Sequence, residues 1–157
     1  MLDLASTLVD RPTLTYDDTG RPHVAGLAVS ISYSLHQIAV AASYDGPIGV
    51  DIEDVRPRHL GVADRWFTPR ELDWMTRQPD RLRAFLHLWT AKEAAGKALG
   101  LGLRRSGLRR EMPVDGGPIE SEPTLAITHL PCADAVLTVA APARSTVLLR
   151  CRTVNDS

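Results

Sequence analysis

The chain has 157 residues, enough for one compact domain or two small lobes with a shared core, and its formal net charge is −1. This near-neutral balance argues against a general nucleic-acid binder, because contacts to many phosphates require a basic excess. We see no apolar run long enough to span a membrane and no secretory signal at the N-terminus, so we expect a cytoplasmic protein without membrane or nucleic-acid partners.

The first part of the chain predicts short strands. Residues 13–16 fit either an edge strand or an arm. Residues 27–33 and 37–43 alternate between apolar and polar side chains, as two strands joined by a short turn do. A further strand is predicted at 49–53, after the turn signal of Gly46-Pro47.

The second part predicts helices followed by strands. Thr68-Pro69-Arg70-Glu71 has the form of a capping box with proline at the first helical position, so one helix begins there and ends near Gln78-Pro79. A longer helix is predicted from about Asp80 to Leu99, where Gly100 can stop it. Later strands are predicted at 125–130, 135–141 and 146–154. The expected fold class is α/β (α+β), with an antiparallel sheet packed against helices.

The strand at 49–53 places two carboxylates on one face. Because side chains alternate along a strand, Val50 and Ile52 face one way while Asp51 and Glu53 face the other. Residues on the same face are about 6.6 Å apart, so the two carboxylates can lean onto one ion and repel each other without it. A divalent cation would relieve that repulsion.

The long helix places a third carboxylate on its apolar stripe. At about 100° per residue, Leu82, Phe85, Leu86 and Trp89 point in one direction, and Glu93 falls on the same line. Since a buried charge without compensation costs several kcal/mol, Glu93 needs a metal, a cation or a hydrogen-bonded cavity. We interpret it as a third metal ligand.

Three carboxylates without a neighbouring His or Cys pair form an oxygen-only set, which suits Mg²⁺ or Mn²⁺ rather than zinc. Magnesium usually takes further ligands from substrate phosphates. Lys97, one helical turn beyond Glu93, could then hold the same phosphate. The implied chemistry is phosphoryl transfer or phosphate ester exchange.

Each motif also has a purely structural interpretation. An Asp-x-Glu strand is common on solvated sheet faces. Glu93 and Lys97 would be an ordinary surface pair, worth roughly 0.2–0.5 kcal/mol, if the helix were rotated. A nucleotide pyrophosphohydrolase would also use clustered carboxylates, but such enzymes commonly carry Glu-x-x-Glu on helices, and neither predicted helix has that pair.

In combination, the two motifs resemble the signatures of the 4′-phosphopantetheinyl transferases. Residues 49–53 match Gly-[Val/Ile]-Asp-[Val/Ile/Leu]-Glu, and residues 89–97 match [Trp/Phe]-x-x-Lys-Glu-[Ala/Ser]-x-x-Lys. Upstream, Gly20-Arg21-Pro22 and Ser30–Ser34 resemble a segment of the longer, Sfp-type branch of this family. The resemblance implies a phosphopantetheinyl-transferase-like fold.

The resemblance also implies a reaction and its residues. Phosphopantetheine would move from coenzyme A to a serine of an apo carrier protein, releasing adenosine 3′,5′-bisphosphate. Asp51, Glu53 and Glu93 would hold magnesium, and Glu93 would also be the candidate general base. Lys97 would hold the pyrophosphate, with Lys92 as a supporting cation. Arg21, Ser32 and Tyr33 would lie at the coenzyme A site together with Lys97.

Two features depart from the Sfp-type pattern. Tyr33 stands where that branch has a phosphate-contacting His, and a phenol cannot become a cation near neutral pH. His36, three residues on, either substitutes for it or is merely solvated. Only 48 residues precede Gly49, so we expect a shortened N-terminal lobe or arm over 1–48 and a core lobe over 49–157. A non-catalytic descendant that binds coenzyme A or a carrier protein is therefore the alternative function.

The expected protein partners are an acidic carrier protein and a second copy of this chain. The four arginines of 104–110 would either steer an acidic, serine-bearing carrier protein of fatty-acid, polyketide or peptide synthesis, or be solvated loop charges. A homodimer is one way to supply what the short first lobe lacks. Cys132 and Cys151 have no metal-ligand spacing and are expected to be free thiols.

Overall fold

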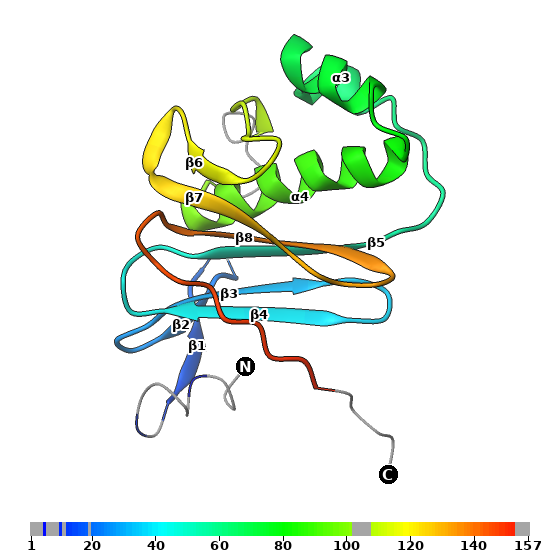
Figure 1. The fold of residues 1–157 in the computed structure, drawn as a ribbon. Helices are drawn as coiled ribbons and strands as arrows, with labels where there is room; N and C mark the ends of the chain where they lie inside the picture. Colours follow the sequence, from blue (N-terminus) through cyan, green and yellow to red (C-terminus); the bar gives the residue numbers. More distant parts are fainter. Residues whose placement is uncertain (1–4, 6–9, 11, 19, 102–107, 153–157) are drawn as a thin grey trace.

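The long helix α4 (Arg81–Ala98) covers one face of a four-stranded antiparallel sheet, and a two-stranded sheet packs against the other face (Figure 1). The computed structural model describes residues 5, 10, 12–18, 20–101 and 108–152. The strands are β1 (Leu14–Tyr16), β2 (Pro22–Val24), β3 (Ala28–Tyr33), β4 (Ile38–Ser43), β5 (Gly49–Asp54), β6 (Gly117–Ile119), β7 (Glu122–Leu130) and β8 (Ala135–Pro142). The helices are α2 (Ala63–Trp66), α3 (Pro69–Thr76) and α4 (Arg81–Ala98). This arrangement confirms the expected fold class.

The four-stranded sheet brings distant parts of the sequence into one register. Its strand order is β5-β8-β7-β6, and every neighbouring pair is antiparallel. Asp51 of β5 lies opposite Thr138 of β8, which in turn lies opposite His129 of β7. These three side chains therefore lie in one row across the sheet.

The two helices begin where the sequence predicts. Thr68 caps α3 in a complete capping box with Glu71, and Asp80 caps α4 by accepting a hydrogen bond from the backbone of Arg83. After α4, Gly100 has a φ of 69°, the left-handed conformation that glycine adopts most easily. In the described part of the chain, no helix is long and apolar enough to cross a membrane.

Alternation along β5 separates two cores. Val50 and Ile52 pack with β8 side chains and with Ala39 and Ala41 of β4 on the side away from α4. Asp51 therefore lies on the opposite face of β5, toward α4, so the predicted alternation holds. The principal core lies between α4 and the sheet, where Phe85 and Leu86 pack with Ile127 and Val136, among others.

One predicted strand is wrong. The described part of 146–154 forms no strand, and Leu148 is 82% exposed. Among the described residues of this segment, only Val147 packs against the core that contains Val50 and Ile52. Residues that alternate in sequence need a sheet edge to pair with before they form a strand. Conversely, the short elements β2, β6 and α2 were not predicted, because each has only three or four residues and little periodicity.

Candidate active site

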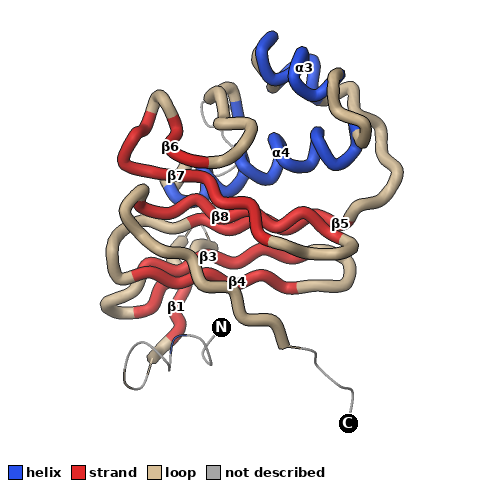
Figure 2. Tube along the Cα trace, viewed as in Figure 1, coloured by secondary structure: helices blue, strands red, loops and turns tan. Residues whose placement is uncertain are grey.

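A glycine sets the distance between α4 and β5. A Cβ atom placed on Gly49 would lie 1.9 Å from the carbonyl oxygen of Ala94 and 2.7 Å from the backbone nitrogen of Ala98. These neighbours are backbone atoms of α4, so no side-chain rotation could make room. The absence of a side chain at Gly49 thus lets the helix carrying Glu93 and Lys97 lie directly on the strand carrying Asp51 and Glu53 (Figure 2).

Asp51 and Lys97 form an ion pair at the centre of this contact. The Nζ atom of Lys97 lies 2.8 Å from Oδ1 of Asp51 and 2.9 Å from the carbonyl oxygen of Val50, with a longer contact of 3.5 Å to the carbonyl oxygen of Ile31. The hydroxyl of Ser32 donates to the same Oδ1 at 2.9 Å. Despite these partners, burial raises the pKa of Asp51 above its usual value. Its other oxygen, Oδ2, is buried without a hydrogen-bond partner.

Glu93 is a buried carboxylate with an unpartnered oxygen. It is 8% exposed, and its Oε1 atom has no hydrogen-bond partner. Burial, reinforced by the charges of Asp51 and Glu53, raises its pKa to about 7, although the Lys97 ammonium acts in the opposite direction. Glu93 thus occupies the apolar stripe, as expected, and is electrostatically coupled to both carboxylates of β5.

Glu53 points to a different partner. Its Oε2 atom accepts a hydrogen bond of 3.0 Å from Nη1 of Arg58, whose Nη2 also donates to the carbonyl oxygen of Asp54. Both side chains of the pair are partly exposed. The pairing of Glu53 with Arg58 was not foreseen from the sequence, because nothing in the residues after β5 indicates that the chain turns back at that point.

The donor set fits a hard divalent cation in part. Among the described residues, no three His, Cys, Asp or Glu side chains are grouped closely enough to hold a metal ion as they stand. Two buried carboxylate oxygens nevertheless lack partners, Oδ2 of Asp51 and Oε1 of Glu93, and an unpaired buried oxygen is costly. Carboxylate oxygens are the ligands that magnesium prefers, so a cation bound by both would remove this cost.

Lys92 is not brought to the site. Its ammonium is completely buried and lies 2.8 Å from Oε2 of Glu71, which is also completely buried. The same ammonium donates to the carbonyl oxygen of Arg110 at 2.6 Å and lies over the ring of Phe67. A side chain with no exposed surface cannot touch a ligand, so this geometry gives Lys92 a structural role instead of the supporting role expected from the resemblance.

Three of the residues expected at the coenzyme A site, Arg21, Ser32 and Tyr33, lie before β5 and do not form one cluster. Arg21 donates to the carbonyl oxygen of Lys97 at 3.3 Å, at the C-terminal end of α4, where a cation is favoured. Tyr33 is 66% exposed at the end of β3, and His36 is exposed in the following turn. Ser32 is buried and is already bonded to Asp51. Arg104 and Arg105 of the arginine-rich segment lie outside the described residues.

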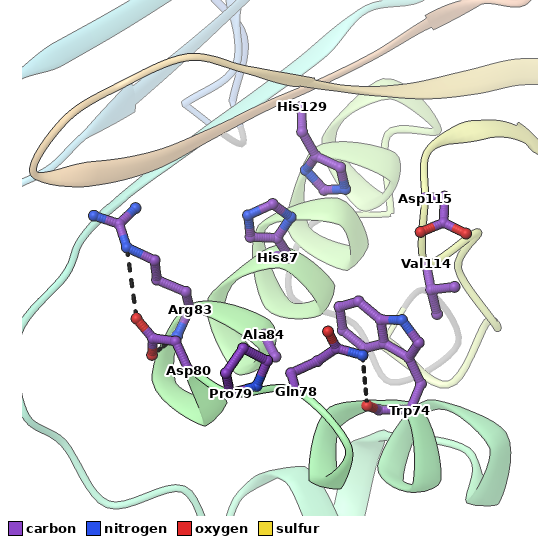
Figure 3. Close-up of a pocket in the computed structure, with 10 residues that line it drawn as sticks. All are labelled: Trp74, Gln78, Pro79, Asp80, Arg83, Ala84, His87, Val114, Asp115 and His129. Atoms are coloured by element: carbon purple, nitrogen blue, oxygen red, sulfur yellow. Dashed lines mark hydrogen bonds and ion pairs between the residues drawn. The ribbon is translucent and has the colours of Figure 1, made fainter.

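A pocket of about 440 Å³ lies on another side of α4 (Figure 3). Its wall includes Trp74 of α3, His87 of α4 and His129 of β7, and the two imidazole rings are 4.4 Å apart. The Nδ1 atom of His129 is bonded to the buried hydroxyl of Thr138 at 2.9 Å. None of the carboxylates or lysines predicted for the site lines this pocket.

Comparison with known proteins identifies the family. A profile of the 4′-phosphopantetheinyl transferase superfamily matches residues 47–128, just over half of the chain. A 4′-phosphopantetheinyl transferase of Bacillus subtilis is 35% identical over 122 residues, which are 72% of this chain and 52% of that protein. The 4′-phosphopantetheinyl transferase psf-1 of Bacillus pumilus is 42% identical over 66 residues, 41% of this chain and 28% of the relative.

A third relative matches to a similar extent. The 4′-phosphopantetheinyl transferase AcpT of Salmonella typhi is 34% identical over 104 residues, covering 62% of this chain and 54% of AcpT. The chain thus spans about half the length, or less, of these curated relatives. The segment matched by the family profile contains every carboxylate and lysine of the candidate site.

Proposed function

Since the chain belongs to the 4′-phosphopantetheinyl transferase superfamily, we propose that it moves phosphopantetheine from coenzyme A to a serine of an apo carrier protein. The observation that carries this proposal is the pair of buried, unpartnered carboxylate oxygens of Asp51 and Glu93 next to the Lys97 ammonium. A cation bound by both oxygens would satisfy them, and a cation beside an ammonium would form a site for a pyrophosphate.

Asp51 and Glu93 would hold magnesium, for which manganese can substitute. Glu53 would complete the carboxylate set after leaving Arg58, or a water would take its place. Magnesium, when bound, would neutralise the negative charge of the pyrophosphate oxygens. Coenzyme A is then the co-substrate, and its pyrophosphate is the part that this site would recognise.

Glu93 is the proposed general base. A base must lie within hydrogen-bond reach of the serine proton, and a carboxylate whose charge is shared with a cation can still accept that proton, directly or through a water. The serine oxygen forms a bond to the phosphorus nearer the pantetheine, and the bond from that phosphorus to the bridging oxygen breaks. The serine proton passes to Glu93, and adenosine 3′,5′-bisphosphate leaves.

Lys97 orients Asp51 before it meets a phosphate. Its three N–H donors are directed at Asp51, Val50 and, at the longest distance, Ile31. We propose that the contact with Ile31 is the one exchanged for a pyrophosphate oxygen, because at 3.5 Å it is the weakest of the three.

The proposed protein partner is an acidic carrier protein. Arg65 and Arg109 both lie over the ring of Trp66, at 5.0 and 5.9 Å from its centroid, so cationic groups gather on the surface formed by α2 and the residues after α4. Local positive potential would raise the rate of encounter with an acidic partner.

Cys132 and Cys151 are free thiols, which supports the cytoplasm as the compartment.

The experiment is an intact-mass measurement of apo carrier proteins incubated with this chain, coenzyme A and magnesium. The panel includes fatty-acid, polyketide and peptide-synthesis carriers, each with a chelator control. The proposal predicts a chelator-sensitive gain of one phosphopantetheine on at least one carrier. Coenzyme A binding without a mass gain on any carrier would favour the non-catalytic alternative.

A further inference from the structure

Serine hydroxyls, and not a backbone ladder, join β3 to β5. Among the named strands, β5 pairs with β8 along one edge, while β3 pairs with β4 in a separate two-stranded sheet. At the other edge of β5, the backbone N–H of Val50 donates to Oγ of Ser30 at 3.1 Å, and that of Ile52 donates to Oγ of Ser32 at 3.3 Å. Both serines are buried, so they satisfy backbone donors that would otherwise lack partners.

The two serines differ in one respect. Besides accepting from β5, the hydroxyl of Ser32 donates its single proton to Oδ1 of Asp51 at 2.9 Å. For Ser30 the described hydrogen bonds of its hydroxyl include only the one from Val50. The chain therefore contains a matched pair of buried serines on one strand, of which only one touches the carboxylate.

The bonds from Ser32 and Lys97 both go to one oxygen of Asp51 and leave the other open. Oδ1 receives both the Ser32 hydroxyl and the Lys97 ammonium, whereas Oδ2 is buried without a partner. With one oxygen held from two directions, rotation of the carboxylate is restricted. The unpartnered Oδ2 is then the atom presented to a ligand, together with Oε1 of Glu93.

We infer that Ser32 is a positioning residue for the divalent cation site, acting through its hydrogen bond to Asp51. The inference rests on the proposed function in one respect, since it takes Asp51 as a cation ligand. It assigns the first part of the chain a role in building the site: β3 supplies a hydroxyl that fixes Asp51, while Ile31 supplies a carbonyl to Lys97. Removing a hydrogen-bond partner of a metal ligand typically lowers metal affinity or activity by about 10–100-fold.

The experiment compares Ser32→Ala with Ser30→Ala in the complete chain. Mn²⁺ binding is measured by calorimetry and by the electron paramagnetic resonance signal of free Mn²⁺, in the absence of coenzyme A and carrier protein. Thermal unfolding in chelator is measured in parallel, since each variant leaves one β5 N–H without its acceptor and is expected to lose a similar amount of stability. Ser32→Cys, which keeps the shape but is a weak donor, distinguishes loss of the hydrogen bond from loss of packing.

The expected result is a loss of Mn²⁺ affinity of about tenfold or more in Ser32→Ala and Ser32→Cys, with Ser30→Ala within about twofold of the wild type. Equal losses in the two alanine variants would overturn the inference, because they would reflect the general weakening of the β3–β5 contact. So would an unchanged Mn²⁺ affinity in Ser32→Ala, or a wild-type chain that binds no Mn²⁺. Failure of the transfer reaction with Mn²⁺ binding intact would instead count against the proposed function alone.

Discussion

Replacing Lys92 by methionine tests whether this lysine belongs to the fold or to the chemistry. The chain has only two lysines, Lys92 and Lys97, so Lys97→Met is a matched comparison. In Lys92→Met, the completely buried Glu71 loses its ionic partner. Glu71 would keep two backbone donors, the N–H groups of Thr68 and Met112, each 2.8 Å away.

The expected cost follows from the burial of this pair. Removing one partner of a buried ion pair typically destabilises a protein by about 3–5 kcal/mol, because the remaining charge is uncompensated. We expect the lower part of this range, since the two N–H donors still solvate the carboxylate. For a chain of this size, 1 kcal/mol corresponds to about 2–4 °C, so a cost of about 3–4 kcal/mol should lower the melting temperature by roughly 6–16 °C. Lys97→Met should cost less, because the Lys97 side chain is 30% exposed and its pairing is partly screened.

The assay combines urea unfolding with the transfer reaction. Lys92→Met is expected to lose stability while its folded fraction keeps near wild-type transfer activity. Lys97→Met is expected to lose less stability but to lose transfer activity. Wild-type stability in Lys92→Met, combined with a loss of transfer as large as that of Lys97→Met, would refute the structural role and restore the one expected from the sequence.

Three further predictions concern packing, pH and the cation. Gly49→Ala should prevent folding or strongly destabilise the chain, because the new Cβ atom would overlap backbone atoms of α4. In the control variant Gly61→Ala, the new Cβ atom would meet only the ring of His59, which can move. Equal melting temperatures of the two variants would contradict this prediction. Burial and the neighbouring His87 lower the pKa of His129 to about 4. Below about pH 6.5 the unfolded chain binds a proton at this imidazole, whereas the folded chain does not until the pH approaches about 4. The free energy of unfolding should therefore decrease as the pH falls from about 6.5 to about 4. The loss is at most about 3 kcal/mol and smaller after solvent screening, and His129→Asn should reduce it in urea unfolding measured across this range. Magnesium at 100 times its dissociation constant should stabilise the wild type by about 2.7 kcal/mol against chelator, and Asp51→Asn should abolish this gain in a thermal shift experiment.

Local chemistry explains which parts of the fold were predictable. The capping box at Thr68 and the cap at Asp80 depend only on neighbouring residues, and both helices begin where these predict. Alternation along β5 likewise determines that Asp51 shares a face with Glu53 once Val50 and Ile52 enter a core. The strand predicted at 146–154 was wrong, because alternation in sequence carries no information about whether a sheet edge is available for pairing.

The contacts of the site depend on packing between elements, which a local pattern does not contain. The resemblance implied a supporting role for Lys92 because it directly precedes Glu93, but its ionic partner Glu71 lies on α3, and only the packing of α3 against α4 brings the two side chains together. The bond from Ser32 to Asp51 depends in the same way on how β3 lies along β5. One signal was available in the sequence: Ser30 and Ser32 alternate with apolar residues, so two hydroxyls must face one side of the strand.

The transferase activity and the role of Glu93 are tested most directly by the rate of phosphopantetheine transfer by the wild type and by Glu93→Gln, followed by intact mass on the same carrier with coenzyme A and magnesium. Glutamine keeps the shape of the side chain but can neither bind the cation as a carboxylate nor accept the serine proton. We expect transfer by the wild type and a rate at least about 100-fold lower for Glu93→Gln, provided that this variant unfolds with wild-type or greater stability in chelator. Transfer by Glu93→Gln at the wild-type rate, or a wild type that modifies no carrier, would contradict the proposed role of Glu93 and the proposed transferase activity.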